Sequence, residues 1–206
     1  MFLCTRAPFV SNEIRAQYAL PPNTFSIVPA FVRPRSRGYL RLKTAEPSGP
    51  LEIQPNFLSE RADVDALVAG IELGFEIASQ PAFRELVKRL VVPPKRMSRG
   101  ERVAFIRRSC STYFHPVGTC AMGSGQDAVV DAELRVRGVE GLRIADASVM
   151  PTITSANTQA PVVMIGEFAS RQLVAGRVAT NESVRSLHDK PASIPVSRPG
   201  ALRDAG

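Results

Sequence analysis

The sequence predicts an α+β fold in which an antiparallel sheet is covered by helices. Residues 38–43 alternate apolar and polar side chains, as a half-buried strand does. Turn-forming residues follow at 46–50, so residues 51–54 can return as a second strand alongside the first. The apolar side chains of residues 63–78 recur instead at the spacing of one helical face. Together these segments give the layered arrangement of strands and helices that defines the class.

Three further elements fit the same fold. Residues 24–32 are typical of a strand. A short helix is expected over residues 81–92, because a proline opens this segment and two prolines follow it. Ser98 and Glu101 stand three residues apart, the spacing of a capping box, which predicts a third helix running to about Cys110.

The C-terminal half is expected to contain short strands and one long helix. The extended and strand-like segments are residues 111–119, 129–131, 134–136 and 142–145. Residues 158–174 form the last predicted helix, which is apolar on nearly all sides, so we expect it to be buried. Residues 177–206 carry prolines, serines and mixed charges without apolar periodicity, and we expect a disordered tail there.

The composition favours a globular chain. The mean hydropathy is −0.02, and no run approaches the roughly 18 apolar residues that a membrane span needs. The first residues lack the charged and apolar segments of a signal peptide, so we expect a cytoplasmic protein without a membrane span. The three cysteines have no paired spacing, which indicates neither a disulfide framework nor a zinc site, and we expect no metal.

A basic stretch accounts for the net charge of +7. Residues 84–108 hold nine lysines and arginines against two glutamates. A nucleic-acid-binding surface would need aromatic side chains among them for base stacking, and Phe105 is the only one. We therefore expect a solvated basic face and no nucleic-acid partner. A basic-surface nucleic-acid-binding module is the weaker alternative.

The two histidines of the chain stand in different surroundings. His188 lies in the polar C-terminal segment, where we expect it to be solvated. His115 is followed by Pro116, with Gly118 and Gly123 close behind. Histidine is the side chain best suited to act as a general base near neutral pH, because its ordinary pKa lies closest to neutrality. A structural role is the alternative for a single histidine.

An ordered series of motifs begins at His115. The motifs are HPVGTCAMG at 115–123, VVD at 129–131, LRVRGV at 134–139, LRIADAS at 142–148 and SANT at 155–158. This series resembles the C-terminal signature of glucose-methanol-choline oxidoreductases. Matching pieces also lie upstream, at 38–42 and 55–58, so the resemblance spans roughly residues 24–176.

The resemblance implies oxidation of a small-molecule alcohol to an aldehyde or ketone, with hydride transfer to N5 of FAD. It assigns His115 as the catalytic base and Asn157 as its partner. A base that removes the hydroxyl proton accelerates the transfer, because a developing alkoxide releases hydride more readily. The Asn157 amide would donate a hydrogen bond to the same oxygen. Asparagine rather than histidine at this place is similar to the choline-dehydrogenase branch of the family.

The resemblance also implies which residues approach FAD. Asp146 and Ala147 correspond to the place where the family's chain passes the ribityl and phosphate region. Asn157, Thr158 and Gln159 lie at the start of the last helix, whose N-terminus would face the flavin pyrimidine with a partial positive charge. A turn at a strand end is the alternative role of Asp146, and a helix N-cap is that of Asn157.

On this resemblance the chain divides into three parts. Residues 1–122 are a portion of the substrate-binding domain, residues 123–176 are the C-terminal strand and helix of a split FAD-binding domain, and residues 177–206 are the tail. Residues 1–60 contain no glycine-rich fingerprint for the ADP half of FAD. We therefore expect a fragment, a truncated reading frame or one subunit of a split enzyme. Such a chain needs an N-terminal FAD-binding half in the same protein or in a separate chain. A non-catalytic remnant is the alternative.

Overall fold

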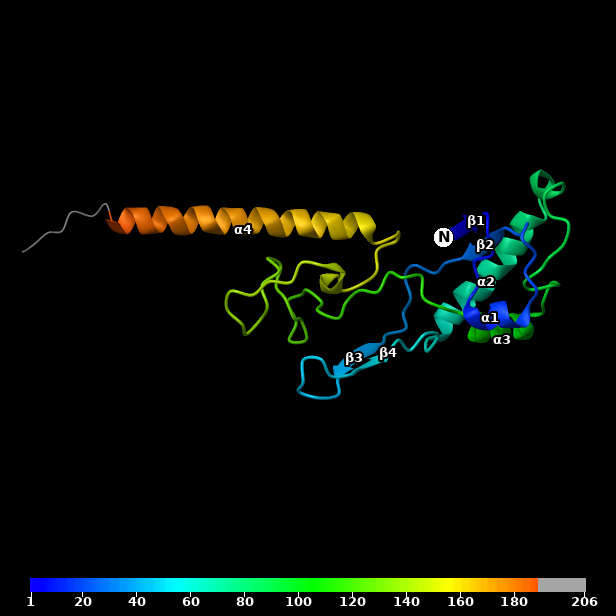
Figure 1. Cartoon of the computed structure of the whole chain (residues 1–206), viewed down its shortest axis with the longest axis horizontal. Helices are drawn as coiled ribbons and strands as arrows, with labels where there is room; N and C mark the ends of the chain where they lie inside the picture. Colours follow the sequence, from blue (N-terminus) through cyan, green and yellow to red (C-terminus); the bar gives the residue numbers. More distant parts are fainter. Residues whose placement is uncertain (189–206) are drawn as a thin grey trace, which may run out of the picture. The chain divides into compact units, whose positions relative to one another are not determined.

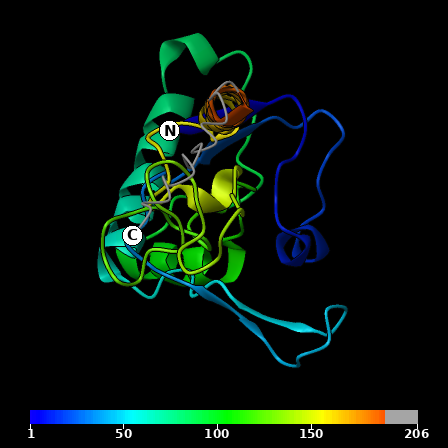
Figure 2. The same cartoon turned by 90° about the vertical axis from the view of Figure 1, so that its left-hand side faces the viewer.

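The computed structural model describes the backbone of residues 1–188 and the side chains of residues 1–175. Contacts within the chain divide it into two compact units, Met1–Gly166 and Glu167–Gly206. The strands are β1 (Phe2–Thr5), β2 (Ser26–Pro29), β3 (Tyr39–Leu42) and β4 (Leu51–Gln54). The helices are α1 (Asn12–Gln17), α2 (Arg61–Ala78), α3 (Arg99–Ser109) and α4 (Gln159–His188), with short 3-10 turns at η1 (Pro81–Phe83) and η2 (Ala147–Val149). Figure 1 and Figure 2 show these elements in two views.

Antiparallel pairing is confirmed, but the described strands form two separate two-stranded sheets rather than one. β4 returns beside β3 as expected, with Tyr39 opposite Gln54. β2 pairs instead with β1, which the sequence did not predict, because four residues are too few to show a clear alternating pattern. β2 also contacts α2, so a helix lies against the first sheet (Figure 1).

The helices α2 and α3 enclose an apolar core in the first unit. The predicted apolar face of α2 is buried at Val64 and Val68, and both pack with Ile106 of α3. The expected capping box begins α3: Glu101 N donates to Ser98 Oγ at 3.3 Å, and Ser98 N donates to the Glu101 carboxylate at 2.8 Å. These reciprocal bonds satisfy amides that the start of a helix otherwise leaves unpaired.

Two short elements differ from the prediction. Residues 81–92 form η1 rather than a complete short helix. None of their side chains is fully buried, and a short helix is unstable without a packed face. The helix α1 was not predicted, because its one buried side chain, Ile14, gives no helical period. Its start is capped by Ser11, whose hydroxyl accepts from Ile14 N.

The three short strands expected between residues 129 and 145 do not form as strands. The chain makes only single bridges there, which join Met122 to Val130, Val130 to Val136, and Arg135 to Arg143. Leu134, Gly138 and Gly141 adopt left-handed backbone conformations. Each of them turns the chain after a few residues, so no continuous ladder of strand pairs develops.

The last helix is longer than expected. It begins at Gln159 and continues past its predicted end at residue 174 to His188. Extending an existing helix is far easier than starting one, and after its first turn no proline occurs before Pro191. The remainder of the expected disordered tail, residues 189–206, lies outside the described residues, as does the His188 side chain.

The expectation that the last helix is buried is wrong for much of its apolar surface. Within the first unit, Val163 is 61% exposed, and Met164 is 60% exposed. Ile165 is the buried residue in the part of this helix that belongs to the first unit. None of the described helices is long and apolar enough to cross a lipid bilayer.

A buried carboxylate fixes the start of α2 to the chain that leads into β3. The Asp63 carboxylate accepts hydrogen bonds from Arg35 N at 2.8 Å, Ser36 N at 2.8 Å and Ser36 Oγ at 2.5 Å. The residue is only 2% exposed. Burial raises the pKa of the carboxyl, but the hydrogen bonds from Arg35 and Ser36 lower it, and its net pKa lies below the ordinary value.

Replacing Asp63 with Asn is expected to lower the free energy of unfolding at pH 7 by about 2–3 kcal/mol, because the amide cannot accept all of these bonds. The pKa of Asp63 is lower in the folded state than in the unfolded chain. Its stabilising effect is therefore present above about pH 4 and is lost as the pH falls through the folded-state pKa. Urea unfolding followed by circular dichroism at decreasing pH measures both effects.

Asp65→Asn is the matched control, because Asp65 lies on the same helix with an exposed carboxylate. It should change the free energy of unfolding by about 1 kcal/mol or less. Equal effects of the two substitutions would contradict the role given to Asp63. So would an Asp63 effect that does not shrink in acid.

Candidate active site

His115 lies in the irregular segment that follows α3, and its ring contacts the residue before α4. The Nδ1 atom is 2.8 Å from the hydroxyl oxygen of Thr158, which is 43 residues away in the sequence. Thr158 is only 6% exposed, and His115 is half-buried. One ring nitrogen is therefore held inside the fold, and Nε2 is the nitrogen left for chemistry.

The two residues before His115 shape its surroundings in different ways. The ring of Tyr113 meets the imidazole edge-on, with 5.0 Å between the ring centroids and 72° between the planes. Phe114 adopts a left-handed backbone conformation, with φ of 61°, and its side chain is 73% exposed. A bulky residue in this region is strained and must be held by its neighbours. The bond from Phe114 N to Thr112 Oγ1 at 2.9 Å is one such restraint.

An open cavity in the first unit has His115 on its wall. Tyr113 and residues 116–119 lie beside it, and further walls come from β2, α2 and residues 151–153. Most of the lining side chains are apolar, which suits a small organic ligand. Among the side chains that the structure describes, His115 is the one histidine that lines the cavity, and histidine is the usual group for proton transfer near neutral pH. Phe114 is not among the lining residues.

The chain that follows His115 runs along η2. Cys120 N donates to Ser148 O at 3.0 Å, and Met122 N donates to Val149 O at 2.8 Å. Gly118 precedes this pairing with a φ of +90°, and a Cβ atom built there would lie 3.4 Å from the carbonyl oxygen of Met150. Glycine therefore allows the chain to leave His115 and approach η2 closely.

Asp146 caps η2, which is the turn role considered as an alternative for it. Its carboxylate accepts a hydrogen bond from Ser148 N at 2.7 Å. The residue is exposed, while Ala147 is half-buried. Because Ser148 also pairs with the segment after His115, the structure brings Asp146 and Ala147 close to that segment. Contact of these two residues with a cofactor stays a prediction.

Asn157 is not the N-cap of α4. The Thr158 carbonyl accepts the first helical bond, from Val162 N at 3.0 Å, so Thr158 holds the cap position and Asn157 precedes it. Asn157 and Gln159 are both exposed. The Asn157 amide makes no hydrogen bond among the side chains that the structure describes. Its catalytic role stays a prediction.

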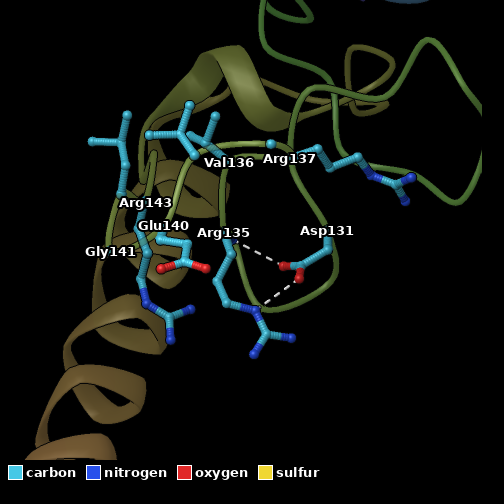
Figure 3. Close-up of a pocket in the computed structure, with 10 residues that line it drawn as sticks. Asp131, Arg135, Val136, Arg137, Glu140, Gly141 and Arg143 are labelled. Carbon is cyan, nitrogen blue, oxygen red and sulfur yellow. Dashed lines mark hydrogen bonds and ion pairs between the residues drawn. The ribbon is translucent and has the colours of Figure 1, made fainter.

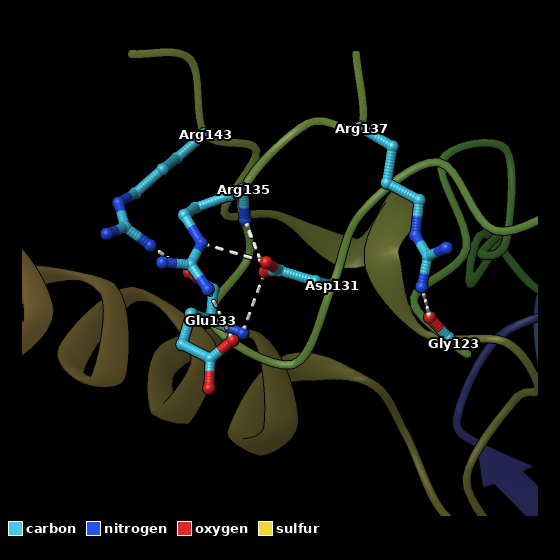
Figure 4. A network of polar contacts seen from close by, with 6 residues as sticks. All are labelled: Gly123, Asp131, Glu133, Arg135, Arg137 and Arg143. Carbon is cyan, nitrogen blue, oxygen red and sulfur yellow. Dashed lines mark hydrogen bonds and ion pairs between the residues drawn. The ribbon is translucent and has the colours of Figure 1, made fainter. Parts of the chain in front are cut away.

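A polar network holds the loop that contains residues 131–143 (Figure 4). The Asp131 carboxylate accepts from Glu133 N at 3.0 Å, from Arg135 N at 2.9 Å and from Arg135 Nε at 2.8 Å. The hydrogen bond with the Arg135 side chain lowers the pKa of Asp131 below its ordinary value. This network fixes the left-handed turn at Leu134, which is buried together with Val149 of η2.

A shallow depression on the same loop is lined by residues 135–143 together with Asp131 (Figure 3). Two of the arginines that line it donate hydrogen bonds to backbone carbonyl groups of the same chain. Arg137 donates to the carbonyl of Gly123 at 2.6 Å, and Arg143 donates to a backbone carbonyl of the preceding turn. We assign these arginines to the stability of the loop.

Part of the basic stretch is neutralised within the fold. Arg99 contacts Asp65 at 2.6 Å, and Arg102 contacts Glu72 at 3.1 Å, so two of the four arginines of α3 pair with acids of α2. These pairs give a structural reason for basic residues in this region. They weaken the alternative of a nucleic-acid-binding face, which needs free cations.

Sequence reasoning missed the hydroxyl of Thr158. Thr158 was predicted only as part of the N-terminus of the last helix, which was expected to face the flavin. The available signal was a threonine three residues before a proline, at the start of an apolar helix. Proline has no amide hydrogen, so the hydroxyl of a threonine three residues earlier lacks one of its usual N-cap donors.

Residues 34–166 match a family model described as GMC oxidoreductase. An alcohol dehydrogenase (acceptor) of Pseudomonas putida is 44% identical over 142 residues, which are 68% of this chain and 26% of that protein. Choline oxidase of Arthrobacter globiformis is 38% identical over 184 residues, which are 85% of this chain and 34% of that protein. The chain thus spans about a quarter to a third of these relatives.

Solved structures also resemble the chain. Pyridoxine 4-oxidase from Mesorbium loti has a TM-score of 0.72 at 33% identity and covers 82% of this chain and 33% of its own. A formate oxidase from Aspergillus oryzae RIB40, described for the effect of a mutation on its FAD modification, has a TM-score of 0.70 at 31% identity. It covers 78% of this chain and 29% of its own.

Gly118→Ala is expected to lower the free energy of unfolding by about 1–2 kcal/mol, because alanine is strained at a φ of +90°. Gly125→Ala is the matched control, since a Cβ atom there meets nothing within 4 Å and its φ is not in the left-handed region. Thermal unfolding of both variants measures the difference. Equal stability of the two variants would show that Gly118 is not required for this turn.

Proposed function

This chain belongs to the GMC oxidoreductase family, and we propose that it supplies the catalytic base and one wall of the flavin site of an alcohol-oxidising enzyme. FAD is the cofactor of this family. The observation that carries the proposal is the placement of His115: one ring nitrogen is bound to Thr158, and the ring lines an apolar cavity. The product would be an aldehyde or a ketone.

The role of His115 follows from its free ring nitrogen. A neutral imidazole that carries its hydrogen on Nδ1, beside Thr158, can take the hydroxyl proton of the alcohol at Nε2. Base catalysis of this kind is typically worth about 10²–10⁴ in rate. The mostly apolar lining of the cavity would lower the local dielectric around the reacting oxygen, which strengthens each polar contact made there.

Asn157 is proposed as the second polar group of the site. It lies next to Thr158 in the chain, and its exposed amide has no partner among the described side chains. The amide can therefore donate a hydrogen bond to the same oxygen that His115 deprotonates. Such a donor orients the substrate and stabilises negative charge on its oxygen.

The start of α4 fits a flavin. Gln159 and Ala160 occupy the first turn of the helix, where amide groups have no helical acceptor, and both residues are exposed. The partial positive charge of a helix N-terminus favours a ring that gains negative charge. When bound, FAD supplies the acceptor for the hydride. Asp146 and Ala147, held near the His115 segment, are proposed to lie close to the same cofactor.

We propose an activity like that of choline dehydrogenases. Relatives of the chain are named as alcohol dehydrogenase, choline oxidase and mitochondrial choline dehydrogenase. Asn157 stands where the resemblance places asparagine in that branch. The proposed substrate is accordingly a small alcohol that is oxidised at its carbinol carbon.

We propose that an N-terminal FAD-binding half, in the same protein or in a separate chain, completes the site. Leu40 and Leu42 of β3 face Ile53 and Leu51 of β4, and all four side chains are exposed on one face of the hairpin. A two-stranded hairpin is only marginally stable without a further layer. Residues 1–122 would then belong to the substrate-binding domain, and residues 123–176 to the FAD-binding domain.

In the enzyme that contains this chain, His115→Ala is expected to slow alcohol-dependent flavin reduction by about 10²–10⁴ while flavin stays bound. The loss of the visible flavin band, followed anaerobically in a stopped-flow instrument, measures the rate. His188→Ala is the control and should leave the rate unchanged. An unchanged rate in His115→Ala would refute the base assignment. Failure of any N-terminal half to confer flavin binding would favour a non-catalytic remnant.

Leu42→Lys is expected to reduce the flavin content of the same enzyme, because it places a charge on the apolar face of the hairpin. Leu42 is 76% exposed, so the stability of the chain itself should change by no more than about 0.5 kcal/mol. Gln54→Lys, on the opposite face of the hairpin, is the matched control. Flavin content per protein after purification is the measurement. Full flavin content in Leu42→Lys would show that this face is not covered.

A further inference from the structure

Thr158 occupies the N-cap position of α4 without using its hydroxyl as a cap. Its carbonyl accepts from Val162 N, which starts the helical bonding. An N-cap hydroxyl normally accepts from the amide two or three residues further on. The third residue here is Pro161, which has no amide hydrogen. No bond joins this hydroxyl to a helix amide in the part of the chain that the structure describes.

The hydroxyl binds His115 instead. The distance from Oγ1 to Nδ1 is 2.8 Å, and Thr158 is 6% exposed. A buried hydroxyl without a partner destabilises a fold, so this bond is expected to persist. The Tyr113 ring packs against the imidazole in a T-shaped arrangement and restricts its rotation. The two contacts together hold the plane and the direction of the His115 ring.

A neutral imidazole carries its hydrogen on one of two nitrogens, and a hydroxyl can pair with either form, as acceptor from N–H or as donor to the bare nitrogen. A base that acts at Nε2 requires the hydrogen on Nδ1. We propose that Thr158 is a positioning residue, which accepts a hydrogen bond from Nδ1–H of His115 and thereby leaves Nε2 unprotonated toward the cavity. This inference rests on the proposed function, because a base at Nε2 matters only if a proton is taken there.

The proton balance follows from this assignment. The hydroxyl proton of the alcohol passes to Nε2, and the imidazole becomes an imidazolium with a hydrogen on each nitrogen. The bond from Nδ1–H to Thr158 exists before and after the transfer, so the ring does not turn during the step. The opposite tautomer carries its hydrogen on Nε2 and cannot accept a proton there.

Nuclear magnetic resonance of the full chain tests the tautomer without any reaction. Long-range 1H–15N spectra of the histidine side chains, recorded where the ring is neutral, report which nitrogen carries the hydrogen. His115→Gln assigns the signals, because His188 is the only other histidine. We expect the Nδ1–H form of His115 in the wild-type chain and in Thr158→Ser, and loss of that preference in Thr158→Val. A wild-type His115 with its hydrogen on Nε2 overturns the proposal even if the valine variant does not fold.

Kinetics of the enzyme that contains this chain give the second readout. Thr158→Val is expected to slow flavin reduction about 10- to 100-fold, a part of the full general-base effect of about 10²–10⁴, with the affinity for alcohol changed less than about twofold. Thr158→Ser restores the acceptor and should recover most of the rate. Equal losses in the two variants, or a loss confined to substrate affinity, contradicts a positioning role.

The two hypotheses fail in different ways. If His115→Ala leaves flavin reduction unchanged, the proposed function fails, whatever the tautomer is. If His115→Ala abolishes reduction while Thr158→Val keeps both the rate and the Nδ1–H form, the base assignment stands and the role of Thr158 is refuted.

Discussion

The hydrogen bond between His115 and Thr158 is the constraint on which the candidate site depends. It joins two residues that are 43 positions apart, one in an irregular segment and the other at the start of α4. An irregular segment cannot orient a side chain by itself, because its backbone lacks the repeated bonds of a helix or strand. The backbone at the start of a helix is held in a fixed position, so the buried hydroxyl of Thr158 is fixed as well. Its hydrogen bond orients the imidazole.

The loop between these residues acts as the support for this bond. A sheet would hold such a loop by its ladders of backbone hydrogen bonds. Here the loop is held instead by its hydrogen bonds to η2, by the left-handed turn at Gly118 and by the Asp131 network. The buried side chains of Val130, Leu134 and Val149 fill the space between the turns. A polar network and a small apolar core thus hold a segment that has almost no regular secondary structure.

The elements that the sequence predicted well are those with a repeated pattern. The apolar face of α2, the capping box of α3 and the pairing of β3 with β4 each leave such a pattern. β1 and α1 are too short to show one, and single bridges depend on contacts between distant residues. The His115 and Asp146 segments could be found by resemblance, but the contact of His115 with Thr158 could not. It depends on how the loop folds back, and on the missing amide of Pro161, which becomes informative only once the helix start is known.

The most direct test of the account is a double-mutant cycle between His115 and Thr158, measured as the rate of anaerobic flavin reduction by alcohol. If Thr158 acts through the imidazole, Thr158→Val slows the reaction in the enzyme with His115 but adds nothing in the His115→Ala background. If the two substitutions instead multiply their effects, Thr158 acts independently of His115, and the claim that this bond prepares the base is contradicted.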